Sequence, residues 1–366
     1  MIGILAMFVY LGCYTDEAHP KGLKILELEE ESGAMSVAAE YPVSNALYQT
    51  LSADGKYLYS CTGEGLSSFK LVGRADPSAP SGGVGTRRPT ILAQVDSVKL
   101  GNCVCHVAAM SDGKRVVFAD YLGGFAGSVE VEDGKFGNPV IHRHSGSGSN
   151  LPRQDKAHCH QAIPTPDGKG YCVVDLGLDQ IVEYPSGRVF NTSPAGAGPR
   201  HLLFHSNGRL AFLVYELGNL VSSLSWSPSD GFKLLDTLPT LPRSTFPVPH
   251  SPYLAAAIRF TPDGKSVVVS NRGENSLVVL DFDEATGKLS FKARTMLSPE
   301  SARSEIAPYH DWPRDFIFVN DTLALVACER SGEVLAMHYD SSTGLFSQVA
   351  ALDGLHRPVA LTTTTR

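Results

Sequence analysis

Short runs of apolar and β-branched residues recur along the chain, and Asp-Gly or Asn-Gly steps separate many of them. The runs 116–118 (VVF) and 171–174 (YCVV) are two examples. Such a step between apolar runs is typical of a tight turn in a β-hairpin. Helical periodicity is nearly absent, so the pattern predicts an all-β protein built from repeated hairpins. The turn glycines are Gly55, Gly113, Gly168, Gly208 and Gly264.

The spacing of the turns predicts repeated units of about four strands, the size of one β-propeller blade. A sixth, degenerate copy (320–322, NDT) has Thr322 in the glycine place. The C-terminal run 358–363 has no turn of its own, and we expect it to complete a sheet with the N-terminal segment 8–35. The chain is therefore predicted to form a single domain over residues 1–366. Its fold would be a seven-bladed β-propeller of four-stranded antiparallel blades, closed by the N- and C-terminal strands.

Two long polar stretches interrupt the repeats. Residues 73–89 are rich in Gly, Pro and Ser and are predicted to form a loop within a blade. Residues 142–157 run directly into a His-Cys-His sequence at 158–160. A loop of this length inside a compact domain is more often functional than idle.

Composition excludes several classes of partner. Lys and Arg number 31 against 38 Asp and Glu, a net charge of −7, and no dense basic patch occurs, so we do not expect nucleic acid as a partner. No apolar run approaches the length of a membrane helix, so no membrane association is expected. The 7 cysteines lack zinc-ligand spacing and are predicted to be buried thiols of a cytoplasmic protein, because the cytoplasm is reducing. We expect a monomer or a weak homodimer.

Equivalent positions of the repeats can be compared by counting from each turn. The residue eight positions before each turn glycine lies at the start of one strand, and the residue eight positions after it lies at the end of the next strand. These two strand ends lie on the same side of an antiparallel hairpin, opposite the turn. Polar and ionisable residues gather there, whereas the strand middles are apolar. Arginine forks bind anions, and a histidine or glutamate can act as a general base. The gathered residues are His106, His158, His160, Arg200, His201, Glu216, Arg272, Arg314, Asp315 and Arg330.

Each of these residues alone is more often structural than functional, as a satisfied histidine or an ion pair between blades. Their coincidence at matched positions favours a site at one mouth of the ring, beside the loop that carries Arg153.

At these positions the chain resembles the seven-bladed propeller lactonases, a family that includes 6-phosphogluconolactonases and a fungal carboxymuconate cyclase. The resemblance covers essentially the whole chain and implies that His160, Arg200, Glu216 and Arg272 are catalytic. It rests on the stretches 8–15 (FVYLGCYT), 146–160 (GSGSNLPRQDKAHCH), 196–201 (GAGPRH), 215–217 (YEL), 270–276 (SNRGENS) and 313–316 (PRDF).

One departure from the family pattern concerns residues 255–259 (AAAIR), which are less polar than the family leads us to expect before the fifth turn. We therefore expect few polar contacts from this strand.

The substrate end of the site would be formed by His106, His158, His201, Arg314, Asp315 and Arg153.

The resemblance implies a carboxylic-ester hydrolase that opens a sugar lactone, foremost 6-phospho-D-glucono-1,5-lactone, to give 6-phosphogluconate in the pentose phosphate pathway. The reaction needs a positioned water, a base and stabilisation of an oxyanion, so we expect neither a metal nor a cofactor, and a small anionic lactone or sugar phosphate as the partner. His160 would be the base, with Glu216 as its orienter or as the alternative base. Arg200 and Arg272 would hold the carbonyl oxygen or the phosphate.

Two other functions remain open on the same residues. One is a lactonising cyclase or lyase that acts on a muconate-like dicarboxylate, which the arginines would bind equally well. The other is a non-catalytic, ligand-binding propeller, because a fold alone does not determine an activity.

Overall fold

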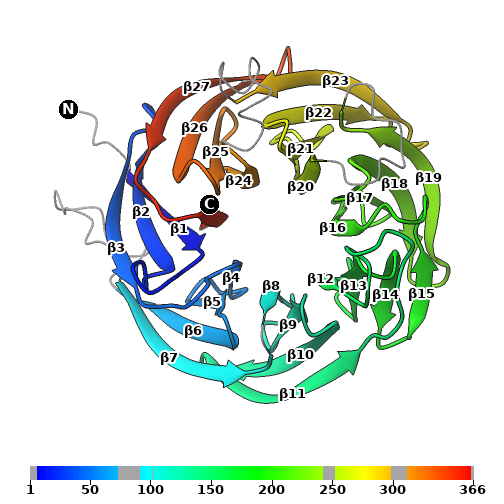
Figure 1. The fold of residues 1–366 in the computed structure, drawn as a ribbon, viewed down its shortest axis with the longest axis horizontal. Coiled ribbons are helices and arrows are strands. Elements are labelled where there is room, and N and C mark those ends of the chain that lie inside the picture. The colour runs from blue at the N-terminus through cyan, green and yellow to red at the C-terminus, as the bar shows by residue number, and fades with distance from the viewer. Residues whose placement is uncertain (1–5, 73–90, 102, 242–251, 298–310, 364–366) are drawn as a thin grey trace.

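The strands are arranged as seven four-stranded sheets in a ring, each seen edge-on in Figure 1. The computed structural model describes residues 6–72, 91–101, 103–241, 252–297 and 311–363, and these contain strands and turns but no helix. Neighbouring strands within each sheet are antiparallel. The predicted seven-bladed β-propeller is therefore confirmed, whereas the predicted loop at 73–89 lies outside the described residues.

Six blades follow one another along the chain, and in each the first strand lies nearest the centre of the ring and the last at its rim (Figure 1). The first three are β4 (Gln49–Leu51), β5 (Tyr57–Cys61), β6 (Gly65–Val72) and β7 (Ile91–Lys99); β8 (Val104–Ala109), β9 (Arg115–Asp120), β10 (Phe125–Glu132) and β11 (Lys135–Arg143); and β12 (Cys159–Pro164), β13 (Tyr171–Asp175), β14 (Gln180–Tyr184) and β15 (Arg188–Asn191). The next three are β16 (Pro199–Phe204), β17 (Leu210–Tyr215), β18 (Leu220–Ser227) and β19 (Gly231–Pro239); β20 (Leu254–Phe260), β21 (Ser266–Arg272), β22 (Ser276–Phe282) and β23 (Leu289–Met296); and β24 (Pro313–Phe318), β25 (Leu323–Cys328), β26 (Glu333–Asp340) and β27 (Leu345–Leu352).

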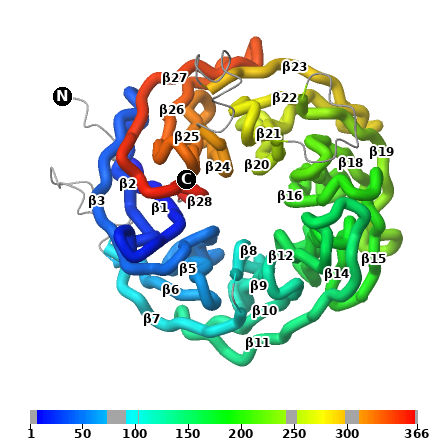
Figure 2. The backbone as a smooth tube through the Cα atoms, viewed as in Figure 1, coloured from blue at the N-terminus to red at the C-terminus, as the bar shows by residue number. Residues whose placement is uncertain are grey.

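The seventh blade joins the two ends of the chain, as Figure 2 shows. Its strands are β28 (Pro358–Thr363), β1 (Ala6–Cys13), β2 (Leu23–Glu29) and β3 (Met35–Tyr41), in this order from the centre outward. Leu11 of β1 lies opposite Leu361 of β28 in an antiparallel register. The predicted closure by the N- and C-terminal strands is therefore confirmed, and it pairs a sheet edge that would otherwise be open.

The five turn glycines share one backbone conformation, so the turns of these repeats have the same shape. Gly55 and Gly208 have φ 67°, Gly113 and Gly168 have φ 68° and Gly264 has φ 70°, a left-handed backbone that glycine adopts without the strain that a side chain would bring. The acidic or amide residue before each glycine accepts a hydrogen bond from the backbone N–H two residues further on. This shared geometry explains why the Asp-Gly step marks the blades so clearly.

The sixth turn differs from the other five by one residue. The N–H of Val319 donates to the carbonyl of Leu323, whereas the equivalent bond after β16 runs from His205 to Leu210 and encloses one residue more. Thr322 therefore does not occupy the glycine place, and positions counted after this turn shift by one. Since Pro313 pairs with Cys328 as Pro199 pairs with Tyr215, the residue equivalent to Glu216 is Glu329, not Arg330.

The apolar strand middles pack between neighbouring blades. One buried cluster joins the β20–β23 blade to the β24–β27 blade through residues that include Val268, Val279 and Val326. A second joins the closing blade to the β24–β27 blade. Each fully buried aliphatic side chain contributes about 1.5–3 kcal/mol relative to an exposed one, so the blades form a stable frame for the polar residues at the strand ends.

The seven cysteines are free thiols, of which all but the half-buried Cys103 are buried. Burial raises the pKa of these thiols, for example that of Cys13 to about 12. Nowhere in the described part of the chain does a helix reach the length and apolarity of a membrane span.

Candidate active site

Polar side chains from the innermost strands meet at the centre of the ring. The rings of His106 on β8, His160 on β12 and His201 on β16 lie edge to face, with centroids 5.6 Å apart for His106 and His201 and 5.2 Å apart for His160 and His201. These residues are 3–6% exposed. The counting of positions from each turn thus brought together residues that are true neighbours in space.

Glu216, which follows β17, lies among three arginines. Its Oε1 contacts Nη2 of Arg153 at 2.5 Å, and its Oε2 contacts Nε of Arg200 at 3.1 Å and Nη2 of Arg272 at 2.7 Å. The side chains of Glu216, Arg200 and Arg272 are only 4–5% exposed. Such bonds between ionised groups, shielded from water, are stronger than neutral ones.

The arginines set the charge state of this carboxylate. Burial by itself would raise the pKa of Glu216, but Arg272, Arg153 and Arg200 outweigh it and hold that pKa well below its usual range. Glu216 is therefore a carboxylate with both oxygens engaged, which makes it a poor general base. The arrangement favours a different part for Glu216, in which it holds the three guanidinium groups in place.

His160 is a candidate for exchanging a proton with a bound molecule. Burial, reinforced by the nearby Arg200, lowers its pKa well below the usual value, so the imidazole is neutral near pH 7. Its Nδ1, like that of His106, is buried and has no hydrogen-bond partner among the described residues. A buried polar atom without a partner is unusual, and here it leaves the ring free to accept a proton from a bound molecule.

A second polar network crosses the centre of the ring. Nη2 of Arg259 donates to Oδ1 of Asp315 at 2.8 Å and to the hydroxyl of Tyr48 at 3.1 Å, although β20 and β4 belong to blades that are not neighbours. The Tyr48 ring in turn stacks on His106 with centroids 4.1 Å apart. Position counting singled out His106 and Asp315 but missed Arg259. Tyr48 occupies the position equivalent to His106 and was not included among the gathered residues.

The expectation of few polar contacts from residues 255–259 is wrong. The carbonyl of Ala256 accepts a hydrogen bond from Nη1 of Arg200 at 2.7 Å, and that of Ala255 accepts one from Arg272 at 3.0 Å. Small alanine side chains allow the guanidinium groups to approach the backbone. Together with Arg259, this strand supplies acceptors and a charge that a count of polar side chains does not reveal.

Glu329 repeats the arrangement of Glu216 two blades further on. Its Oε2 accepts from Nη1 of Arg314 at 3.1 Å, and its Oε1 is paired with Arg357. Both guanidinium groups also lie over the ring of Tyr14. Arg330 stacks on Trp312, 3.6 Å from the ring centroid, and Arg272 lies over the same ring. Counting from the sixth turn therefore selected Arg330, whereas the residue equivalent to Glu216 is Glu329.

The loop before β12 is tied to the site through Tyr121. His158 stacks on the Tyr121 ring with centroids 4.4 Å apart, and its two ring nitrogens contact the Tyr121 carbonyl and the Asp155 carboxylate. The Tyr121 hydroxyl accepts a hydrogen bond from Arg153 at 3.3 Å. His158 therefore positions the loop, while Arg153, whose side chain is 38% exposed, is the most exposed of the arginines at Glu216.

We expect Glu216→Gln to lower the free energy of unfolding by about 3–5 kcal/mol, because it leaves buried guanidinium groups without a counter-ion. Urea denaturation measures the change. As a control, Glu64→Gln removes only an exposed ion pair with Lys99 and should change little. A loss below about 1 kcal/mol in Glu216→Gln would mean that the carboxylate does not hold the arginines together.

Groups of side chains with the geometry to hold a metal ion occur elsewhere in the described residues. One is Asp16, His19 and His356, and the other is His144, Cys159 and Asp175. In the second group, Nδ1 of His144 bonds Asp175 at 2.7 Å, while the other oxygen of Asp175 accepts three backbone N–H groups, so this group fastens the loop to β13.

Comparison with known proteins agrees with this architecture. The profile of the family described as Lactonase, 7-bladed beta-propeller, matches residues 8–362. The chain is 29% identical to a 6-phosphogluconolactonase of Bacillus subtilis, over 96% of this chain and 97% of the relative, and 24% identical to a 6-phosphogluconolactonase of Formosa agariphila, over 92% and 93%. It shares the fold of a periplasmic gluconolactonase of Pseudomonas aeruginosa, with a TM-score of 0.83, 22% identity and 99% of each chain covered.

Proposed function

The chain belongs to the seven-bladed β-propeller lactonase family, and from that premise we propose that it hydrolyses 6-phospho-D-glucono-1,5-lactone to 6-phosphogluconate. The names of the Bacillus and Formosa relatives support this substrate. The setting that we propose is the pentose phosphate pathway of the cytoplasm.

The observation that carries the proposal is the neutral His160 beside the cluster of Arg153, Arg200 and Arg272 on Glu216. Further arginines, Arg259 and Arg314, each face a carboxylate nearby. Positive charge therefore exceeds negative charge at the centre of the ring, although the chain as a whole carries −7. Such a site attracts a phosphorylated or carboxylated molecule.

In the proposed reaction, His160 removes a proton from a water molecule whose oxygen forms a bond to the lactone carbonyl carbon. The carbonyl oxygen becomes an oxyanion that Arg200 and Arg272 stabilise. The bond between the carbonyl carbon and the ring oxygen then breaks, and the protonated His160 returns its proton to the departing ring oxygen. The product is the open carboxylic acid, which ionises at neutral pH.

The phosphate end of the substrate would be held by arginines that can turn toward it. Arg153 is partly exposed and comes from a loop, and Arg314 is 18% exposed. A guanidinium fork matches two phosphate oxygens at once. His106, His201 and Asp315, on the inner strands, would shape the part of the site around the sugar ring.

The first experiment is hydrolysis of freshly prepared 6-phosphogluconolactone, corrected for its spontaneous opening. Wild type is compared with Arg200→Ala and with His338→Ala, a control on an exposed residue of β26. Strong turnover that is lost only in Arg200→Ala supports the proposal. A wild-type rate no higher than background would contradict it, and turnover of muconate-type acids would then favour the cyclase alternative.

We expect a chelator such as EDTA to leave the rate of lactone hydrolysis unchanged. The carboxylates at the centre of the ring are already paired with arginines, and the surrounding positive charge repels a cation. The measurement is turnover after dialysis against EDTA, with dialysis against buffer as the control. A loss of activity that Mg²⁺, Ca²⁺ or Zn²⁺ restores would show that this reasoning is wrong.

A further inference from the structure

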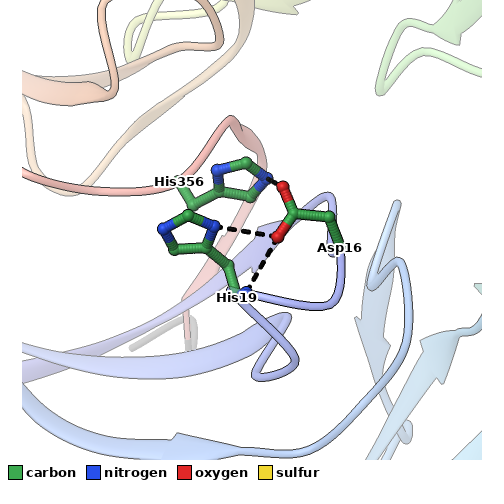
Figure 3. A group of neighbouring side chains, drawn as sticks. All are labelled: Asp16, His19 and His356. Carbon is green, nitrogen blue, oxygen red and sulfur yellow. Dashed lines mark hydrogen bonds and ion pairs between the residues drawn. The ribbon is translucent and has the colours of Figure 1, made fainter.

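Two histidines and one aspartate meet on the surface of the closing blade, away from the Glu216 cluster. Asp16 and His19 lie in the β1–β2 loop, and His356 lies in the β27–β28 loop. Figure 3 shows both imidazole rings facing the carboxylate of Asp16. Nδ1 of His19 is 2.9 Å from Oδ1, and Nε2 of His356 is 3.2 Å from Oδ2. Residues from opposite ends of the chain thus converge on one carboxylate.

The backbone holds these loops in place. The N–H of Tyr14 donates to the carbonyl of Arg357 at 3.1 Å, which joins the two loops next to the cluster. The N–H of His19 donates to Oδ1 of Asp16 at 2.8 Å and fixes the carboxylate. The imidazoles stack with centroids 4.0 Å apart and planes 3° from parallel. The cluster is therefore organised before any ligand arrives.

We propose that Asp16, His19 and His356 bind Zn²⁺ or a related divalent transition-metal ion. Imidazole nitrogen and carboxylate oxygen are the donors that zinc, nickel and copper accept. The three donor atoms lie within 4.8 Å of one another, whereas donors on one tetrahedral zinc ion are about 3.3 Å apart. The ion would replace the shared contacts to Asp16, and water would complete its coordination.

The three ligand side chains are partly exposed, so they can shift slightly and bring their donor atoms around one ion. The side chains of His19 and Asp16 are 55% and 51% exposed, and that of His356 is 23% exposed. The parallel rings must tilt so that both nitrogens point at a common centre. Nearby cations are already paired, Arg357 with Glu329 and Lys24 with Glu40, so they offer little opposition to a metal ion.

A metal ion at this position would link the loops on either side of the ring closure. Because it binds the folded chain and not the separated ends, it stabilises the closed ring by mass action. At a free metal concentration one hundred times the dissociation constant, the melting temperature should rise by about 3 °C. The inference does not depend on the proposed lactonase activity.

The test is calorimetric titration of the untagged full chain with ZnCl₂, together with melting temperatures with and without the metal. We expect one ion per chain, and at least tenfold weaker binding in His19→Ala, His356→Ala and Asp16→Asn. The control His338→Ala, at an exposed residue of β26, should bind like wild type. Each variant is first compared with wild type without metal, so that the metal-dependent shift is separated from any change in folding.

Titration with Co²⁺ distinguishes this site from the cysteines. The expected absorption spectrum lacks a thiolate charge-transfer band, because the proposed ligands are nitrogen and oxygen. No saturable binding to wild type, or unchanged binding to the His19→Ala/His356→Ala double variant, would overturn the proposal. A thiolate band would overturn it too, since the ion would then be bound by cysteine.

Discussion

Replacing His160 with alanine is expected to lower kcat for lactone hydrolysis by about 100- to 10,000-fold, the contribution typical of a positioned general base. The expectation follows from a neutral imidazole whose buried Nδ1 has no partner among the described residues, next to arginines that can hold an oxyanion. The rate is measured with saturating lactone after subtraction of spontaneous opening. His160→Gln should lose as much, because an amide cannot take the proton.

The matched control for this experiment is His201→Gln. His201 is also buried, and its imidazole packs edge to face against that of His160. Unlike His160, it has a partner for its nitrogens, because Nη1 of Arg200 lies 3.4 Å from each of them. We therefore expect a smaller loss of kcat in His201→Gln than in His160→Gln. Both variants should retain cooperative unfolding in urea. Equal losses in the two variants would mean that packing of the histidines, not proton transfer by His160, governs the rate.

The fold could be predicted from the sequence because its repeated features are local. An Asp-Gly turn needs a left-handed glycine wherever it occurs, and the strands beside it are apolar for the same reason in every blade. The sixth turn could not be aligned in this way. It lacks one residue, and only the pairing of Pro313 with Cys328 reveals that Glu329 is the equivalent of Glu216.

The candidate site was predicted in part for the same reason. Position counting found His160, Arg200 and Glu216, because inner strands carry equivalent residues to the centre of the ring. It could not find Arg259, whose side chain reaches Tyr48 on a blade that is not a neighbour. Nor could it find the backbone carbonyls of Ala255 and Ala256, since every residue has a carbonyl and only packing decides which ones accept a bond from arginine.

The arginine clusters follow one plan. Arg200 and Glu216 come from the start of the first strand and the end of the second strand of one blade, and Arg314 and Glu329 do the same in another. In each case an arginine from elsewhere completes the pair, Arg272 for Glu216 and Arg357 for Glu329. Each carboxylate is thus shared between guanidinium groups, and the excess positive charge is what suits the centre of the ring to an anion.

The protein is expected to lose stability steeply as the pH falls from 6.5 to 5. Burial lowers the pKa of His106 to about 3 and holds those of His160 and His201 well below the usual value. The unfolded chain takes up a proton on each of these histidines below about pH 6.5, and the folded chain does not. The contribution of these histidines to the free energy of unfolding is therefore complete above that pH. It is lost as the pH falls, by about 1.4 kcal/mol per histidine per pH unit.

For the three histidines together, the free energy of unfolding should fall by about 4 kcal/mol per pH unit near pH 5.5. Urea denaturation between pH 8 and pH 5 measures this slope. Replacing His106 or His201 with glutamine removes one titrating group and should reduce the slope by about a third, whereas His338→Gln, an exposed position, should leave it unchanged. A slope that is the same in wild type and in the buried variants would show that the pKa of His106 and His201 is not lower in the folded chain than in the unfolded chain.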